Sequence, residues 1–278
     1  MTPGRPSSLM ADRSFFGLSI GQDPVSRTLL SAVFICAAFF VVTIPAWLFD
    51  TRMLDGVNIW LKPEKFNISL GLHFLTIAIL LTQIPVEKRN SPFLRRATFL
   101  ALTSLVLEQV YVTVQVARGR RSHFNYETLA EILFYAMMGI GALLMVFLAL
   151  ALALEIYRGG RFKGTGYHLG AILGLTIGAI TTIAYGGYMS ARGSHWVGAH
   201  PLGGASIPIF GWSREVGDLR SAHFVTLHMM QALPIAGWVF DRLPLPSRAL
   251  VIALGAGLLL LATTLFVQAL NAQPFWPV

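Results

Sequence analysis

Four ionisable side chains stand inside hydrophobic stretches of the sequence, where a charge is costly to bury. They are His73, Glu108, Glu131 and His228. Imidazole and carboxylate groups suit Zn, Fe or Mn, and a metal-bound water is a nucleophile at neutral pH. We therefore expect His73, Glu131 and His228 to bind a divalent metal and Glu108 to accept or relay a proton. A structural network of hydrogen bonds between helices is the alternative.

Further polar and aromatic residues crowd the segments next to these stretches. His123, Asp218 and Arg220 join Glu108 as candidate catalytic residues, although helix capping explains Asp218 equally well. We assign eight more residues to substrate binding or to a covering lid: Lys62, Lys65, Arg118, Arg121, His195, His200, Trp212 and His223. The basic ones predict a rim that attracts an anionic substrate or lipid headgroup, or that simply contacts phosphates.

His223 and His228 are five residues apart, which separates them by about 140° on a straight helix. Only one of them can then face a central site. We expect that one to be His228, which lies deeper, and we expect His223 to face the lid.

The elements that position these residues follow from composition. Of 278 residues, 55% are hydrophobic and 12% are charged, and the mean hydropathy is +0.64, which excludes a soluble enzyme. A membrane-crossing helix needs about 20 apolar residues. We predict an all-α bundle of seven transmembrane helices in a lipid bilayer, at residues 28–48, 67–86, 97–117, 126–156, 166–189, 221–240 and 249–270.

The predicted bundle, residues 28–270, has an N-terminal segment at 1–27, a lid loop at 190–220 and a C-terminal tail at 271–278. Twelve of the 21 Lys and Arg residues lie on the N-terminal side, and basic loops favour the cytoplasm. We therefore expect the N-terminus inside and the C-terminus outside, although the small margin leaves the reverse open. The positive charges flank apolar spans, so the net charge of +8 indicates topology and lipid contact rather than nucleic acid.

Several functional classes lack their defining residues. The single cysteine, Cys36, excludes an intrachain disulfide, a thiolate zinc cage and an iron–sulfur cluster. No predicted span contains a lysine, which excludes a retinal Schiff base. Motifs of zinc proteases, serine hydrolases, ATPases and dinucleotide-binding enzymes are missing. Gly170, Gly174 and Gly178 share one helix face and predict a tight helix pair.

Three segments carry a resemblance to a known group. They are DGVNIWLKPEKF, ARGRRSHFN and GWSREVGDLRSAHFVTLHMMQALP, in that order along the chain. In this order the chain, from Asp50 to Pro234, resembles a group of uncharacterised bacterial seven-helix integral membrane proteins. The resemblance implies a bacterial inner membrane and no particular activity. A weaker likeness links the chain to membrane hydrolases of the ceramidase and adiponectin-receptor type, but their last span carries two zinc-binding histidines and this one carries none.

Three functions remain open from the sequence. The first is a metal-dependent membrane enzyme that acts on a lipidic or small anionic substrate. The second is a proton-coupled transporter or binding protein that uses Glu108, Glu131 and His228. The third is an electron-transfer protein with haem b between His73 and His228. The oligomeric state is not predicted.

Overall fold

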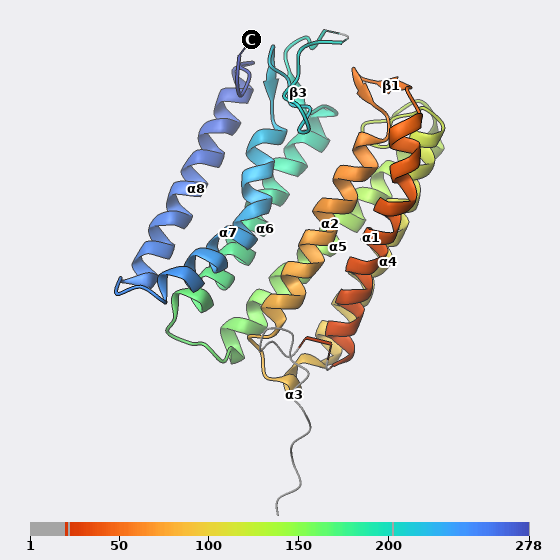
Figure 1. Ribbon diagram of the computed structural model, residues 1–278. Helices are drawn as coiled ribbons and strands as arrows, with labels where there is room; N and C mark the ends of the chain where they lie inside the picture. Colours follow the sequence, from red (N-terminus) through yellow and green to blue (C-terminus); the bar gives the residue numbers. More distant parts are fainter. Residues whose placement is uncertain (1–19, 22, 202, 278) are drawn as a thin grey trace, which may run out of the picture.

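The computed structural model describes residues 20, 21, 23–201 and 203–277, so the predicted segment 1–27 lies mostly outside the described residues. Long helices run side by side along one direction (Figure 1). The helices are α1 (Pro24–Phe49), α2 (Leu61–Leu81), α3 (Val86–Arg89), α4 (Pro92–Ala117), α5 (Leu129–Gly159), α6 (Gly166–Arg192), α7 (Arg220–Phe240) and α8 (Ser247–Leu270).

Six of these helices, α1, α2, α4, α5, α6 and α8, are long and apolar enough to cross a membrane. The seventh long helix, α7, is not among the six, but it packs against both α6 and α8. The protein is therefore a helical bundle of the multi-pass membrane type, which confirms the predicted class. Large apolar side chains such as Phe34 and Leu260 are exposed on its sides, where lipid would cover them.

The two ends of the bundle differ in complexity. One end carries the C-terminus and the longer connections, and we call it the upper end (Figure 1). Its loops form two small hairpins, β1 (Met53–Leu54) with β2 (Val57–Asn58), and β3 (Trp196–Val197) with β4 (Gly217–Asp218). Asp55 and Gly56 both have positive φ, as a two-residue hairpin turn of type I′ requires. The lower end carries α3 and the short connections.

Helix boundaries shift from the prediction where polar caps act. α2 spans 61–81 rather than 67–86, because Pro63 fits the first turn of a helix. At its other end the Thr82 hydroxyl bonds to the carbonyl of Ile79, and Pro85 disfavours helix in the residue before it. α5 begins three residues later than predicted, because the hydroxyl of Thr128 accepts a hydrogen bond from the backbone of Glu131 and caps the helix.

The glycine face of α6 confirms the predicted tight pair, and α7 is the partner. A Cβ placed on Gly170 would lie 2.3 Å from the carbonyl oxygen of Leu233, and one on Gly174 would lie 2.6 Å from that of Met229. Such contacts require hydrogen in place of a side chain. The pair therefore fixes the position of α7 relative to α6.

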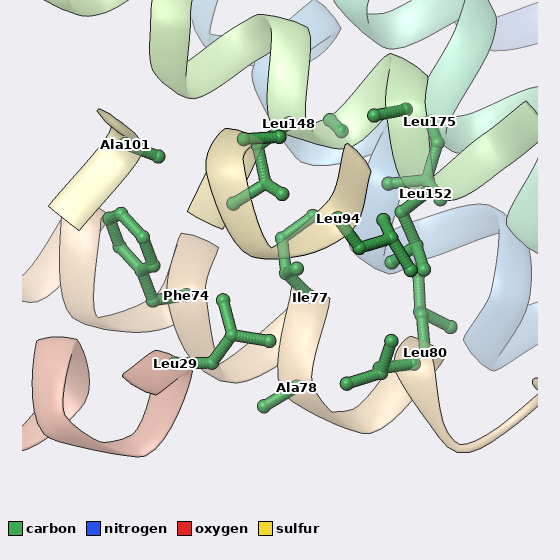
Figure 2. Packing of buried hydrophobic residues seen from close by; sticks show 14 of the residues in the cluster. Leu29, Phe74, Ile77, Ala78, Leu80, Leu94, Ala101, Leu148, Leu152 and Leu175 are labelled. Atoms are coloured by element: carbon green, nitrogen blue, oxygen red, sulfur yellow. The ribbon is translucent and has the colours of Figure 1, made fainter. Parts of the chain in front are cut away.

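The main core lies where α1, α2, α4 and α5 meet α6. Figure 2 shows its apolar side chains, with Phe74 and Ile77 of α2 near Leu29 of α1, Leu152 of α5 near Leu175 of α6, and Leu148 of α5 in the same cluster. These residues are at most 1% exposed. Their packing holds the helices whose upper ends carry the polar residues.

Candidate functional site

A carboxyl, an imidazole and an amine meet near the upper end of the bundle. Glu108 lies on α4 about 14 Å below the upper end of that helix. Its Oε1 is 4.0 Å from Nε2 of His123, in the loop between α4 and α5, and its side chain is 6% exposed. Nδ1 of the same ring lies 3.1 Å from Nζ of Lys62, in the first turn of α2. We call Lys62, Glu108 and His123 the relay cluster.

The protonation of the His123 ring follows from its surroundings. Burial lowers the pKa of His123 well below its ordinary value, and the charges of Lys62 and His195 act in the same direction. The ring is therefore neutral at neutral pH, with one nitrogen that accepts and one that donates. With Lys62 as an ammonium group, which only donates, Nδ1 accepts and Nε2 carries the hydrogen on the side of Glu108.

The cluster could pass a proton if the 4.0 Å gap between Nε2 of His123 and Oε1 of Glu108 closed to hydrogen-bond length. The second carboxyl oxygen of Glu108, Oε2, is buried and has no hydrogen-bond partner among the described residues. The His123 side chain, in contrast, is 25% exposed. Transfer of the Nε2 proton to the Glu108 carboxylate, with transfer of a Lys62 proton to Nδ1, would leave a neutral carboxylic acid, a neutral imidazole and a neutral amine. The structure thus brings together two candidate catalytic residues, Glu108 and His123, and one predicted binding residue, Lys62.

The loop between α6 and α7, described at residues 193–201 and 203–219, contacts this region, and we call it the lid. Nζ of Lys65, on α2, donates to the carbonyl of Phe210 at 3.2 Å. Nη2 of Arg220, on α7, donates to the carbonyl of Gly211 at 2.6 Å. Lys65 and Arg220 both lie close enough to Lys62 for their positive charges to disfavour its ammonium form. Three cations from two helices therefore converge here, and two of them hold adjacent carbonyls of the lid.

Asp218, which is buried, and Arg220, whose side chain is 30% exposed, form an ion pair at the base of the lid. Oδ2 of Asp218 lies 2.6 Å from Nη2 of Arg220 and also accepts from the backbone of Ser213 at 3.0 Å. Burial raises the pKa of Asp218, but the hydrogen bond and charge of Arg220 outweigh it, so the pKa lies below its ordinary value. The N-cap of α7 is Leu219 rather than Asp218. Oδ1 of Asp218 nevertheless accepts from the backbone amide of Arg220 at 3.1 Å, so the carboxylate both holds the first amide of α7 and orients the guanidinium.

A row of rings connects the relay cluster to the lid. The ring of Phe124 is 5.7 Å from that of His195, which is 4.3 Å from Trp196, which is 4.1 Å from His200. Burial lowers the pKa of His195 to about 3, and the nearby charge of Arg220 contributes. His195 is therefore neutral, and the predicted lid residues His195 and His200 contact the lid's own ring stack.

Trp212 and His223 lie away from the relay cluster. Trp212 is 8% exposed and packs against Phe224 and Phe275, so it anchors the lid through apolar contact. His223, which we expected to face the lid, packs against α6, because a Cβ on Gly186 would lie 3.1 Å from its Cε1.

The predicted metal ligands His73, Glu131 and His228 do not form a metal-binding group. Among the residues described, no three His, Cys, Asp or Glu side chains are arranged to hold a metal ion. Glu131 lies in the first turn of α5 rather than deep in the membrane, because the helix begins at Leu129. Its Oε1 accepts from Arg120 at 2.6 Å, which gives the carboxylate a cationic partner instead of a metal.

His73 and His228 lie at one level on facing helices. Gln231 of α7 donates to the hydroxyl of Thr76 of α2 at 3.0 Å, and both helices run downward from the upper end. Each histidine precedes its bonded neighbour by three residues, so both lie about 4.5 Å above that hydrogen bond. Nδ1 of His228 contacts the carbonyl of Phe224 at 2.8 Å, and Nε2 of His73 is buried without a partner in the described part of the chain.

The predicted basic rim is smaller than the sequence suggested. Arg121 forms an ion pair with Asp55, and Arg118 donates to the side chain of Gln115 at 2.9 Å. The guanidinium groups of Arg121 and Arg118 are therefore bound to Asp55 and Gln115 rather than to the relay cluster. Lys62, Lys65 and Arg220 are the predicted basic residues that the structure brings together.

Sequence reasoning missed a second buried polar group. Thr43, Glu64, Asn67 and Gln109 are each at most 4% exposed, on α1, α2 and α4. The predicted span 67–86 leaves Glu64 outside the helix, whereas the structure places it in the first turn of α2. Its spacing of three residues from Asn67, on one helix face, is the signal that could have revealed it.

No protein-family model, curated protein or solved structure matches the chain. Functional assignment therefore rests on the geometry and chemistry of the residues themselves.

Proposed function

We propose that the protein binds a small anion at its upper end and couples this binding to protonation of Glu108, as a proton-coupled transporter or binding protein. The observation that carries the proposal is the relay cluster. Glu108 is an ionisable group inside a membrane helix, has an unpartnered oxygen within the described structure, and connects through His123 to Lys62. Intramembrane carboxyl groups with such connections are typical of proton relays.

The lid supplies the anion-binding half of the proposal. Lys65 and Arg220 now donate to the carbonyls of Phe210 and Gly211. An anion is a stronger acceptor than a neutral carbonyl, so it would replace these partners and release the lid. Its negative charge would also offset the Lys62 ammonium, whose repulsion disfavours the protonated ring of His123. Anion binding and proton uptake would then favour each other.

We also propose seven crossings, with the N-terminus in the cytoplasm and the upper end outside the inner membrane of a bacterium. α6 and α8 both run from the lower to the upper end, so α7 has to return between them (Figure 1). A phosphatase fused to the C-terminus, active only outside the cytoplasm, tests this orientation. A fusion that is expressed normally but is inactive would place the C-terminus in the cytoplasm and contradict the proposed orientation.

Proton movement tests the main proposal. Vesicles that contain the purified protein and an internal pH dye would be exposed to phosphate, sulfate and acetate in turn. We expect anion-dependent acidification that falls at least about tenfold in Glu108→Gln, the usual loss when a proton-transfer group is removed. Glu155→Gln, at the lower end of α5, is the control and should retain the wild-type rate. Equal rates in wild type and Glu108→Gln, together with no Glu108 carboxyl band in infrared difference spectra, would refute the relay.

A second candidate, haem binding between α2 and α7, has its own supporting observation. His73 and His228 lie at one level on α2 and α7. Nδ1 of His228 donates to the carbonyl of Phe224, which leaves Nε2 of His228 available as a ligand. Bis-histidine haem would make the protein an electron carrier. Protein purified after haem-replete expression should then show a Soret band that is lost in His228→Ala. Colourless protein would remove this candidate, and metal analysis of the same sample tests binding of a divalent metal.

A further inference from the structure

The buried polar group of Thr43, Glu64, Asn67 and Gln109 is incompletely hydrogen-bonded. Thr43 is 4% exposed, Glu64 3%, Asn67 2% and Gln109 1%. Oε2 of Glu64, Nδ2 of Asn67 and Oε1 of Gln109 have no hydrogen bond of ordinary geometry within the described structure, although the Asn67 side chain lies close enough to interact with the Glu64 carboxyl. Three such orphans in one place are costly, because each buried polar atom without a partner loses its hydration. We call these four residues the amide–carboxyl cluster.

Direct contacts join the four side chains across three helices. Oγ1 of Thr43, on α1, lies 2.6 Å from Oε1 of Glu64, on α2. Asn67 follows on the same face of α2, and its Oδ1 accepts a hydrogen bond from Nε2 of Gln109, on α4. Side-chain oxygens of one carboxyl, one hydroxyl and two amides are therefore gathered in one place.

The carboxyl of Glu64 has no positive partner. No salt bridge to Glu64 is present among the residues that the structure describes. The Thr43 hydroxyl has a single hydrogen, and it also lies 2.7 Å from the carbonyl of Phe39. When the Thr43 hydroxyl donates to the carbonyl of Phe39, the 2.6 Å contact with Glu64 is a hydrogen bond only if the Glu64 carboxyl is protonated and donates to Thr43. The carboxyl thus needs either a proton or another cation.

An apolar layer separates the cluster from the upper end. Ile59, Trp60 and Val116 are 3%, 8% and 1% exposed and pack together. Trp60 precedes Glu64 by one turn of α2, and Val116 lies about 10 Å above Gln109 along α4. The cluster is therefore enclosed within the protein.

We propose that the amide–carboxyl cluster binds a monovalent cation, Na⁺, in exchange for the proton of Glu64. Oxygen ligands suit hard cations. In membrane transporters, oxygen atoms of interrupted helices coordinate Na⁺ or H⁺ inside the bilayer. One carboxylate balances one positive charge, whereas a divalent ion would leave a net charge in an apolar interior. Each Na⁺ that binds releases one proton from Glu64 to solution, so charge and atoms balance.

Cation-dependent stability tests this proposal independently of the relay cluster. The thermal midpoint of the purified full chain would be compared in NaCl and in choline chloride at equal ionic strength. A ligand at a hundred times its Kd should raise the midpoint by roughly 5 °C. Glu64→Gln keeps the shape of the side chain but not its charge, so we expect it to fold and to show no difference between the two salts. Glu155→Gln is the control and should respond as wild type does.

Two further measurements keep the test decisive if Glu64→Gln fails to fold. Thr43→Val removes one oxygen without changing the side-chain shape and should weaken the apparent Na⁺ affinity about tenfold. Addition of NaCl to wild type in weak buffer should release protons, and choline chloride should not. Equal midpoints of wild type in both salts, or a Na⁺ response retained in Glu64→Gln, would show that the cluster is only a structural contact between helices.

Discussion

The contact between α6 and α7 makes a quantitative prediction, because Gly170 lies directly against the backbone of α7. A Cβ at this position would be 2.3 Å from the oxygen of Leu233 and 2.9 Å from the Cα of Pro234, whereas ordinary contact begins at 3.4 Å. Gly170→Ala therefore forces the two helices apart by roughly 1 Å, which forfeits a quarter to a half of the dispersion energy at the affected contacts. Neither obstacle is a side chain that can rotate away.

The expected cost follows from two opposing effects. Overpacking costs about 1–3 kcal/mol, and a backbone obstacle places this case at the upper end of that range. Alanine in place of glycine returns up to about 1 kcal/mol of helix propensity. We expect Gly170→Ala to lower the free energy of unfolding by about 2 kcal/mol.

Unfolding in mixed micelles, followed by circular dichroism, measures this difference. Gly187→Ala is the matched control on the same helix, since nothing lies within 4 Å of a Cβ there. The control should be neutral or up to about 1 kcal/mol more stable. If the two variants unfold at the same denaturant concentration, the close α6–α7 contact is wrong.

Three further predictions concern the ends of the bundle. Asp241 accepts from two backbone amides at the start of α6, so Asp241→Asn should cost about 1 kcal/mol in the same unfolding assay. Burial raises the pKa of Asp241, but its hydrogen bonds outweigh burial and hold the pKa below its ordinary value. The stabilisation by Asp241 is therefore present above about pH 4 and is lost as the pH falls further. The stability of Asp241→Asn should depend less on pH in that window. A Cβ on Gly217 would lie 2.0 Å from the oxygen of Ala269, so Gly217→Ala should loosen the lid from α8 and speed proteolysis of the lid, and an unchanged digestion rate would contradict this contact. Arg220→Met leaves Asp218 buried without its cation and should destabilise the protein by about 3 kcal/mol, whereas equal stability would mean that the pair is not formed.

Part of the fold was predictable because hydrocarbon imposes a simple rule on sequence. A backbone in lipid has to satisfy its own hydrogen bonds, so each long apolar stretch becomes a helix. The same rule predicted the helices that carry Glu108 and His228. The glycine spacing of Gly170, Gly174 and Gly178 predicted a close partner, because small residues on one face serve little else.

The candidate site was predictable only in its ingredients. Lys62, Glu108 and His123 were all named from their residue types, but nothing in their spacing indicated that they contact one another. The predicted metal group failed at Glu131, because the position of a cap decides whether a carboxylate lies in the membrane or at its edge. Arg120 pairs with that carboxylate, and nothing in its spacing from Glu131 indicated the contact.

The sequence by itself determined the helical class, the approximate spans and the presence of ionisable groups inside them, since these depend on the composition of short windows. Only the tertiary structure decided which groups face each other. Rotation of a helix by one residue turns a side chain by about 100°, and that rotation is set by packing against several neighbours at once. For that reason the pairing of Glu108 with His123, and of Glu64 with Thr43, emerged only from the folded chain.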